Sequence, residues 1–160
     1  MQWAKVTDII LFTAILVLLV FVGFGLYQWA TRRSLAKVDK ALLGFIPPIL
    51  IMMATYFIFD KLLILNVRPD GSGDPSFPSS HVMVVATIFF ITMLALPKYL
   101  KQKSLIVILD ALMLLMVTLV SVGRVLANMH WVSDVVAGLI FAAIFTVIYY
   151  LITKTRSSHE

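Results

Sequence analysis

The sequence predicts an all-α membrane protein, a polytopic helical bundle with five transmembrane helices. Of its 160 residues, 61% are hydrophobic and only 13% are charged, which is about half the charged fraction usual in soluble domains. The mean hydropathy is +1.02. This composition excludes a disordered chain, a fibrous repeat and an ordinary soluble protein. We therefore expect the whole chain, residues 1–160, to form a single membrane domain.

Five apolar stretches, each near the roughly 20 residues that a membrane span needs, account for the predicted helices. They cover residues 9–30, 41–65, 81–96, 104–126 and 132–153. The first is too long for the apolar region of a secretory signal, which has about 7–15 residues, and no small-x-small cleavage site follows it. The third is the shortest and is followed by Pro97. In the fifth, Gly138 and Ala142 lie four residues apart and predict a face for close helix packing.

The links between the stretches predict the orientation. The net charge is +5, and nine of the 13 Lys and Arg residues lie in segments 31–40 and 97–103 and in the tail after residue 153. The positive-inside rule makes these segments cytoplasmic, and they fall on one side of a five-span alternation. The amino terminus is then outside and the carboxyl terminus cytoplasmic. Topology thus explains the basic charge, and no nucleic-acid partner is expected. Because the chain has no cysteine, disulfides, thiolate catalysis and Cys-ligated metals are excluded.

Lys61 and Arg68, the latter followed by Pro69, form a first polar cluster at the outer end of the second stretch. The two cations are seven positions apart, which predicts that they lie on one helical face. A lysine inside a span is costly and by default suggests a function. The alternative is that Lys61 pairs with a carboxylate such as Asp60, or extends outward to water.

The second cluster is Pro78-Ser79-Ser80-His81, at the start of the third stretch. Either serine is a suitable N-cap, and the free N–H groups of the first helical turn then point outward. Such a helix end binds anions readily. The alternative is an ordinary serine cap beside an interfacial histidine.

Arg124, His130 and Asp134 form the third cluster, in which Arg124 closes the fourth stretch and His130 and Asp134 open the fifth. The i,i+4 spacing predicts that Asp134 lies on the same helical face as His130. A carboxylate there would accept a hydrogen bond from one ring nitrogen, which fixes the tautomer and raises the basicity of the other nitrogen. The alternative is a structural polar pair that caps a helix.

The predicted topology places all three clusters at the outer membrane face. They supply three cations, hydroxyl and N–H donors at a helix end, and two histidines. Cations and fixed donors suit the equatorial oxygens of a phosphoryl group in transfer. A carboxylate-oriented histidine suits a nucleophile, and a second histidine suits a general acid.

The order and spacing of these residues resemble the three motifs of the type-2 phosphatidic acid phosphatase superfamily, whose membrane members are lipid phosphate phosphatases. The resemblance covers a core of about residues 61–138. The matching residues are Lys61-(six residues)-Arg68-Pro69, Pro78-Ser79-Ser80-His81 and Gly123-Arg124-(five residues)-His130-(three residues)-Asp134. The sequence departs from the family in having Ser80 for a usual glycine, Gly123 for a usual serine, and five spans where six are common.

The resemblance implies a role for each site residue. His130 would be the nucleophile that forms a phosphohistidine, Asp134 its orienting partner, and His81 the acid that protonates the leaving group. No cofactor or metal is implied, and a cation site at Asp134 is disfavoured because a metal would compete with the fixed cations for the anion. The phosphate oxygens would be held by Lys61, Arg68, Ser79, Ser80 and Arg124.

From the resemblance and the predicted topology we expect a phosphatase in a bacterial cell membrane, with its site on the extracytoplasmic face. Its expected partners are membrane lipids and a lipid phosphate or diphosphate, most specifically an isoprenoid diphosphate of the undecaprenyl type. One alternative is a phosphatidic acid or phosphatidylglycerophosphate phosphatase. Another is a non-catalytic binder or translocator of lipid phosphates. The oligomeric state is left open.

Overall fold

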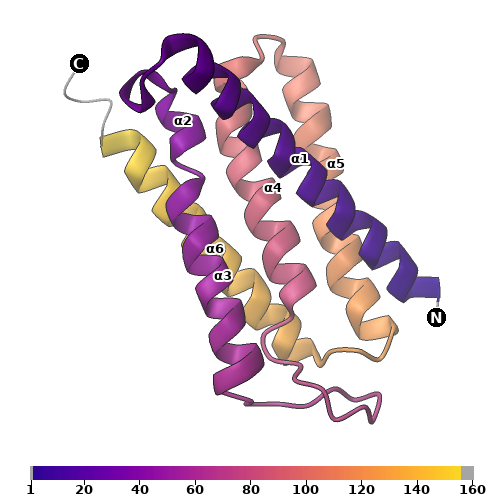
Figure 1. Ribbon diagram of the computed structural model, residues 1–160. Helices are drawn as coiled ribbons and strands as arrows, with labels where there is room; N and C mark the ends of the chain where they lie inside the picture. The colour runs from indigo at the N-terminus through magenta and orange to yellow at the C-terminus, as the bar shows by residue number, and fades with distance from the viewer. Residues whose placement is uncertain (1, 156–160) are drawn as a thin grey trace.

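The computed structural model describes residues 2–155, which form a bundle of long helices joined by short links and one longer loop (Figure 1). Five of these helical segments are long and apolar enough to cross a membrane, which confirms the predicted all-α fold with five spans. In chain order the elements are α1 (Gln2–Arg32), the 3-10 turn η1 (Leu35–Lys37), α2 (Lys40–Leu43), α3 (Ile46–Phe57), the π-helical turn η2 (Ile58–Leu62), α4 (Ser80–Tyr99), α5 (Lys103–Leu126) and α6 (Val132–Thr155).

Helix α4 is the centre of the bundle. Its most apolar window is 56% buried, against 28% or less in the other spans. Helices α1, α5 and α6 pack around it, and α3 packs mainly on α6. The amino-terminal end of α4 therefore lies among the ends of several helices rather than at the rim.

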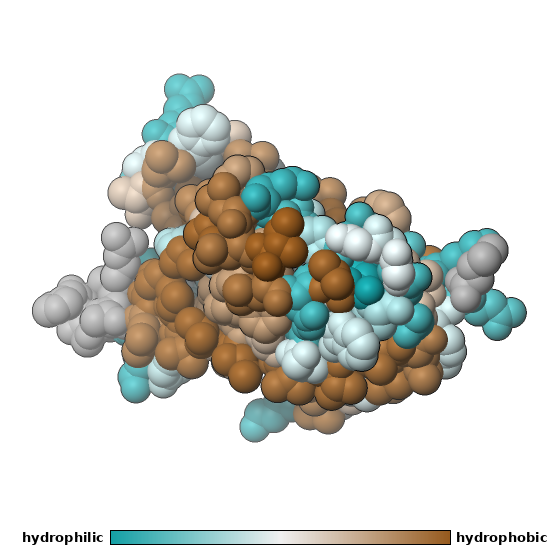
Figure 2. All heavy atoms as spheres, turned by 90° about the horizontal axis from the view of Figure 1, so that it is seen from below, coloured by the Kyte–Doolittle hydropathy of each residue, from teal (hydrophilic) through white to brown (hydrophobic). Residues whose placement is uncertain are grey.

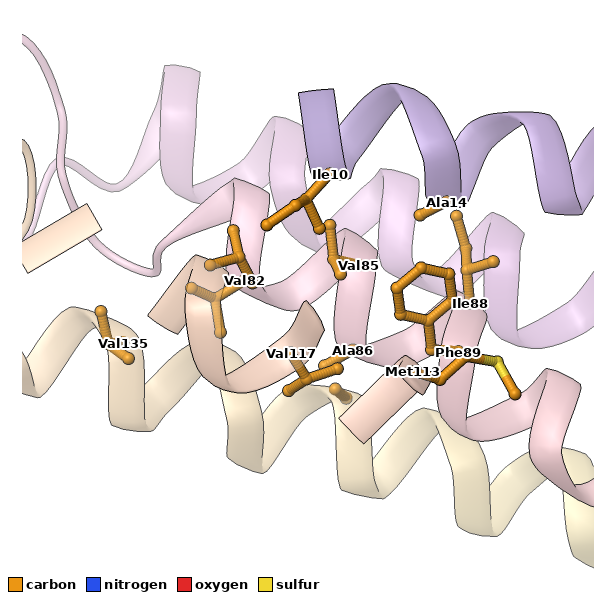
Figure 3. Packing of buried hydrophobic residues seen from close by; sticks show 12 residues of the cluster. Ile10, Ala14, Val82, Val85, Ala86, Ile88, Phe89, Met113, Val117 and Val135 are labelled. Carbon is orange, nitrogen blue, oxygen red and sulfur yellow. The ribbon is translucent and has the colours of Figure 1, made fainter. Parts of the chain in front are cut away.

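Hydrophobic side chains from four helices form the main core (Figure 3). Helix α4 contributes the largest share, and α1, α5 and α6 add residues from three sides. Lipid tails are as apolar as these side chains, so close packing rather than removal from water stabilises the contacts. The buried core residues that Figure 3 labels are Ile10, Ala14, Val82, Val85, Ala86, Ile88, Phe89, Met113, Val117 and Val135.

The predicted small-residue face of α6 packs against the start of α4. A Cβ on Gly138 would lie 3.0 Å from the carbonyl oxygen of Ser79 and 3.3 Å from the backbone nitrogen of Met83. Ala142, one turn further along α6, is fully buried. This confirms that the spacing of Gly138 and Ala142 serves close packing, and it fixes the first turn of α4 against α6.

The second predicted span, 41–65, is not one continuous helix. It divides at Gly44 and Phe45, and its helical part ends at Leu62. Pro47 and Pro48 have no N–H to donate to the preceding turn, so they begin a new helix instead of extending the old one. The predicted end of this span, residue 65, therefore lies beyond the end of the helix at Leu62.

The two ends of the bundle differ in chemistry. The three clusters of the predicted site lie at the end where α4 begins and α5 gives way to α6, at the bottom of Figure 1. Segments 31–40 and 97–103, which carry seven of the 12 described Lys and Arg residues, lie at the opposite end. There Gln28 donates a hydrogen bond of 2.8 Å to Asp39. This bond, with Arg32, lowers the pKa of Asp39 below its ordinary value.

Candidate active site

Hydrophilic residues gather on one part of the molecule's end, next to a large hydrophobic area (Figure 2). The loop before α4, the first turn of α4, the last turn of α5 and the turn into α6 meet at this end of the bundle. Several hydrogen bonds join the loop to the α5–α6 turn, two of them from side chains next to His130. Trp131 Nε1 donates to the carbonyl of Val67 at 2.8 Å, and Asn128 Nδ2 donates to the carbonyl of Pro69 at 3.3 Å.

His130 lies buried in this end, and its hydrogen bonds fix its tautomer. Its Nδ1 is 2.8 Å from the carbonyl oxygen of Ser76, which only accepts hydrogen bonds, so Nδ1 carries the proton. Its Nε2 is 3.5 Å from Nη2 of Arg124, which only donates. Nε2 therefore carries no proton, and its lone pair, which here accepts this long hydrogen bond, is the one that a nucleophile requires.

Burial also keeps this imidazole neutral. Loss of solvent is the largest effect and the charge of Arg124 adds to it, so the pKa of His130 is lowered to about 4. The Ser76 carbonyl and Asp134 oppose this shift, and Arg68 adds to it. At neutral pH the side chain is an uncharged base.

Asp134 lies near His130 but is not its hydrogen-bond partner. Its Oδ2 is 3.9 Å from His130 Nδ1, and it accepts the N–H of Trp131 at 3.0 Å. Its Oδ1 accepts from Asn66 at 3.3 Å, and its carbonyl accepts the N–H of Ser79 at 3.0 Å. The i,i+4 argument does not apply because α6 begins at Val132, so His130 precedes the helix. The geometry gives the orienting contact to Ser76, while Asp134 caps α6 and ties it to α4.

The two arginines of the predicted site are brought together with His130. Arg124 is almost fully buried, and its Nη1 lies 3.4 Å from Thr7 Oγ1. Arg68 is half-buried, with its Nε 3.5 Å from the carbonyl of Pro75 and its Nη1 4.0 Å from Asp74. The charges of both guanidinium groups lower the pKa of His130.

The start of α4 has the expected cap, with one difference. Ser79 is the N-cap residue, but its side chain makes no capping hydrogen bond. Ser80 lies in the first turn with helical backbone, so replacing the family's glycine introduces no left-handed strain. Among the described residues, three buried polar atoms at this end have no hydrogen-bond partner, namely Ser76 Oγ, Ser79 Oγ and Arg124 Nε. A buried polar group without a partner is costly, and each of the three is able to donate to an acceptor oxygen of the kind that a phosphate carries.

The structure does not bring Lys61 into this cluster. Its side chain is 65% exposed and pairs with Asp60 at 2.8 Å, which is the alternative that the sequence left open. Helix η2 ends at Leu62, so Arg68 lies beyond the helix and the seven-residue spacing does not place it on the face of Lys61. The described site thus has two cations at its centre rather than three.

Sequence reasoning missed Asp8, which reaches the site from α1. Its Oδ1 lies 3.0 Å from Nε2 of His81 and 3.7 Å from Nη1 of Arg124. A signal was present, because Thr7 and Asp8 come just before the first apolar stretch, at the predicted outer face. Ser76 was also missed. It contacts His130 through its backbone carbonyl, which every residue has, so no sequence pattern indicates this role.

Within residues 2–155, no group of three or more His, Asp or Glu side chains is arranged to hold a metal ion. The polar groups that converge are two histidines, two arginines, helix-end donors and Asp8. This set suits an anion that is attacked by one histidine and protonated by the other.

Comparison with known proteins decides the family. A sequence model of the PAP2 superfamily matches residues 14–158. The chain belongs to the PAP2 superfamily. No curated protein matches it. Among solved structures, the PAP2 chain resembles a transmembrane PAP2-type phosphatidylglycerolphosphate phosphatase from Bacillus subtilis, with a TM-score of 0.65 and 21% identity over 98% of this chain and 77% of that one. At that identity the likeness concerns the fold, which is that of a PAP2 membrane phosphatase.

Proposed function

We propose that this PAP2 protein hydrolyses a lipid phosphate or diphosphate at the extracytoplasmic face, through a phosphohistidine on His130 and without a metal ion. One observation carries the proposal. His130 is buried and neutral, with Nδ1–H held by the Ser76 carbonyl and with Nε2 beside Arg124. A histidine in that state is prepared to attack a phosphorus atom whose oxygens the arginine binds.

The reaction has two steps. In the first, His130 Nε2 attacks phosphorus, the bond from phosphorus to the lipid oxygen breaks, and that oxygen takes the bond's electron pair and a proton from His81. In the second, water attacks phosphorus, the P–N bond breaks, its electron pair returns to His130, and His81 receives the proton of the water. Arg68, Arg124 and the N–H groups of the first turn of α4 stabilise the charge on the equatorial oxygens.

An isoprenoid diphosphate of the undecaprenyl type is the first candidate substrate. The loop before α4 carries Asp70 and Asp74 but no cation after Arg68, so few groups offer hydrogen bonds to a glycerol head group. A diphosphate needs mainly positive charge, and its tail needs an apolar path between helices.

Phosphatidylglycerophosphate or phosphatidic acid is the second candidate. The similar Bacillus subtilis protein is a phosphatidylglycerolphosphate phosphatase. In addition, Lys61 pairs with Asp60, which leaves less positive charge for a diphosphate than the sequence motifs imply.

Phosphate release from purified protein tests both candidates in one detergent. We expect kcat/KM for undecaprenyl or farnesyl diphosphate to exceed that for either glycerophospholipid by about 10–100-fold, since charge and shape alone give modest selectivity. A preference for a glycerophospholipid supports the second candidate. No release from any of them favours a binder or translocator.

The covalent step has its own test. His130→Ala should abolish turnover and retain binding of the lipid phosphate, and rapid quench of the wild type should trap an acid-labile phosphoprotein. Thr13→Ala is a suitable control, because the Thr13 hydroxyl bonds only to the carbonyl of Ile9, in its own helix. Turnover at the wild-type rate in His130→Ala would contradict the scheme.

A further inference from the structure

The carboxylate of Asp8 touches the two groups that the reaction needs beside His130. Its Oδ1 is 3.0 Å from His81 Nε2 and 3.7 Å from Arg124 Nη1. We propose that Asp8, on α1, is a positioning residue that holds the ring of His81 and its proton for transfer to the leaving oxygen. This inference rests on the proposed function and adds a residue outside the three motifs to it.

The packing of α1 against α5 holds Asp8 in this position. Thr7, next to Asp8, is fully buried, and its hydroxyl lies 3.4 Å from Arg124 Nη1. A Cβ on Gly123 would lie only 2.7 Å from Thr7 Cγ2 and 3.4 Å from the ring of Trp3. Glycine at position 123, where the family usually has serine, is what allows α1 to approach α5 so closely.

The charges around His81 explain why a carboxylate is useful there. Arg124 from α5 lies 3.7 Å from the same carboxylate oxygen that contacts His81, and positive charge beside a histidine disfavours the imidazolium. Asp8 supplies the opposing negative charge within hydrogen-bond distance of Nε2. A carboxylate in this place favours the imidazolium that a general acid must be.

The hydrogen bond also selects the ring nitrogen that reacts. A carboxylate accepts a hydrogen bond from Nε2–H, so this proton stays on the ring of His81, bonded to Asp8. The proton that is exchanged in the reaction is then the one on Nδ1. In the first step that proton goes from Nδ1 to the lipid oxygen as the P–O bond breaks, and in the second step Nδ1 takes a proton from the attacking water. Asp8 remains a carboxylate throughout.

This role predicts an effect that depends on the leaving group. An alkyl monoester such as phosphatidic acid leaves as a strongly basic alkoxide and needs the acid, whereas an aryl phosphate needs little protonation. Asp8→Asn should lower kcat for dioctanoyl phosphatidic acid by about 10–100-fold, a part of what general acid catalysis contributes. It should lower kcat for p-nitrophenyl phosphate less than about threefold. Asp8→Glu should restore part of the loss.

Asp39→Asn is the matched control. It removes the same charge at the opposite end of the bundle, where Asp39 bonds to Gln28, and it should leave both rates unchanged. Equal losses on both substrates in Asp8→Asn would reduce Asp8 to a structural role. A rise in activity would mean that its carboxylate competes with the substrate phosphate. Either result overturns the inference.

The packing argument is tested separately. Gly123→Ala should push Thr7 away and reproduce the leaving-group pattern of Asp8→Asn. Adding Thr7→Ser removes Cγ2 but keeps the hydroxyl, so the double variant should recover. A double variant as impaired as Gly123→Ala alone would show that this contact does not place Asp8.

A readout without turnover separates this inference from the proposed function. The chain has three histidines, so 15N-histidine NMR in micelles, assigned with His81→Ala and His130→Ala, resolves each ring. Asp8→Asn should change the ring nitrogen signals of His81 and leave those of His130 in place. Unchanged His81 signals refute the pairing, whatever the activity. Changed signals in a protein that releases no phosphate support the pairing and reject the proposed function.

Discussion

Acid should destabilise this protein through His130. Folding lowers the pKa of this histidine from the ordinary 6.5 to about 4, first by burial and then by the charge of Arg124. Between these two values the unfolded chain binds a proton that the folded chain does not. The free energy of unfolding therefore falls as pH falls from about 6.5 to about 4, and it gains nothing from this group above that window.

The expected size follows from the shift. A difference of about 2.5 pKa units corresponds to about 3 kcal/mol. The other groups that act on this ring are Arg68, which adds to the shift, and the Ser76 carbonyl and Asp134, which oppose it. The change in the free energy of unfolding is thus the net result of all these groups, and loss of solvent around His130 is the largest of them.

The assay compares wild type with His130→Gln, in which a side-chain amide still donates to the Ser76 carbonyl but does not titrate. Reversible unfolding is measured in mixed micelles at pH 7.5 and at pH 4.5. We expect the wild type to lose about 2–3 kcal/mol more than the variant on acidification, since all other titrating groups are shared. Equal losses in the two proteins would mean that His130 is protonated near pH 6.5 in the folded state, and would remove the basis for a neutral nucleophile.

Three further predictions concern the orientation, the absence of a metal and the packing at the site. Single cysteines, Ser34→Cys and Ser72→Cys, should react oppositely with an impermeant thiol reagent on intact cells, and labelling of position 34 alone would invert the topology. Phosphate release should persist in excess EDTA and be inhibited by vanadate, and loss in EDTA with rescue by Mg²⁺ would contradict the metal-free scheme. Gly138→Ala places a Cβ 3.0 Å from the Ser79 carbonyl and should cost about 1–3 kcal/mol with reduced activity. Gly23→Ala, whose Cβ would meet nothing within 4 Å, should cost neither, and equal effects of the two changes would refute the packing argument.

The sequence predicts the fold well because lipid imposes a simple rule on it. Each span must satisfy its own backbone hydrogen bonds, so a run of about 20 apolar residues is a helix with few alternatives. The division of the second span was missed, although Pro47 and Pro48 are the residues that cause it. Orientation in the membrane is still a prediction from the basic links.

The site was predictable to the extent that its residues lie in local patterns. His81, Arg124 and His130 are brought together at one end of the bundle, as the motifs imply. The partner of His130 was not foreseen, because the Ser76 carbonyl belongs to an irregular loop and any residue has a carbonyl. Asp8 was not foreseen because its contact to His81 depends on how closely α1 packs on α5. Only the packed structure shows that contact.

The hydrogen bonds from Trp131 to Val67 and from Asn128 to Pro69 restrict how this loop can change in evolution and in engineering. These bonds hold the stretch that contains Arg68 against the turn that contains His130. An added residue in either segment would therefore displace both side chains. The tip is different, since Gly71 and Gly73 have φ of +81° and +78° and face open space. Insertions at that tip are where a new head-group preference, or an affinity tag, could be added while the reacting groups keep their places.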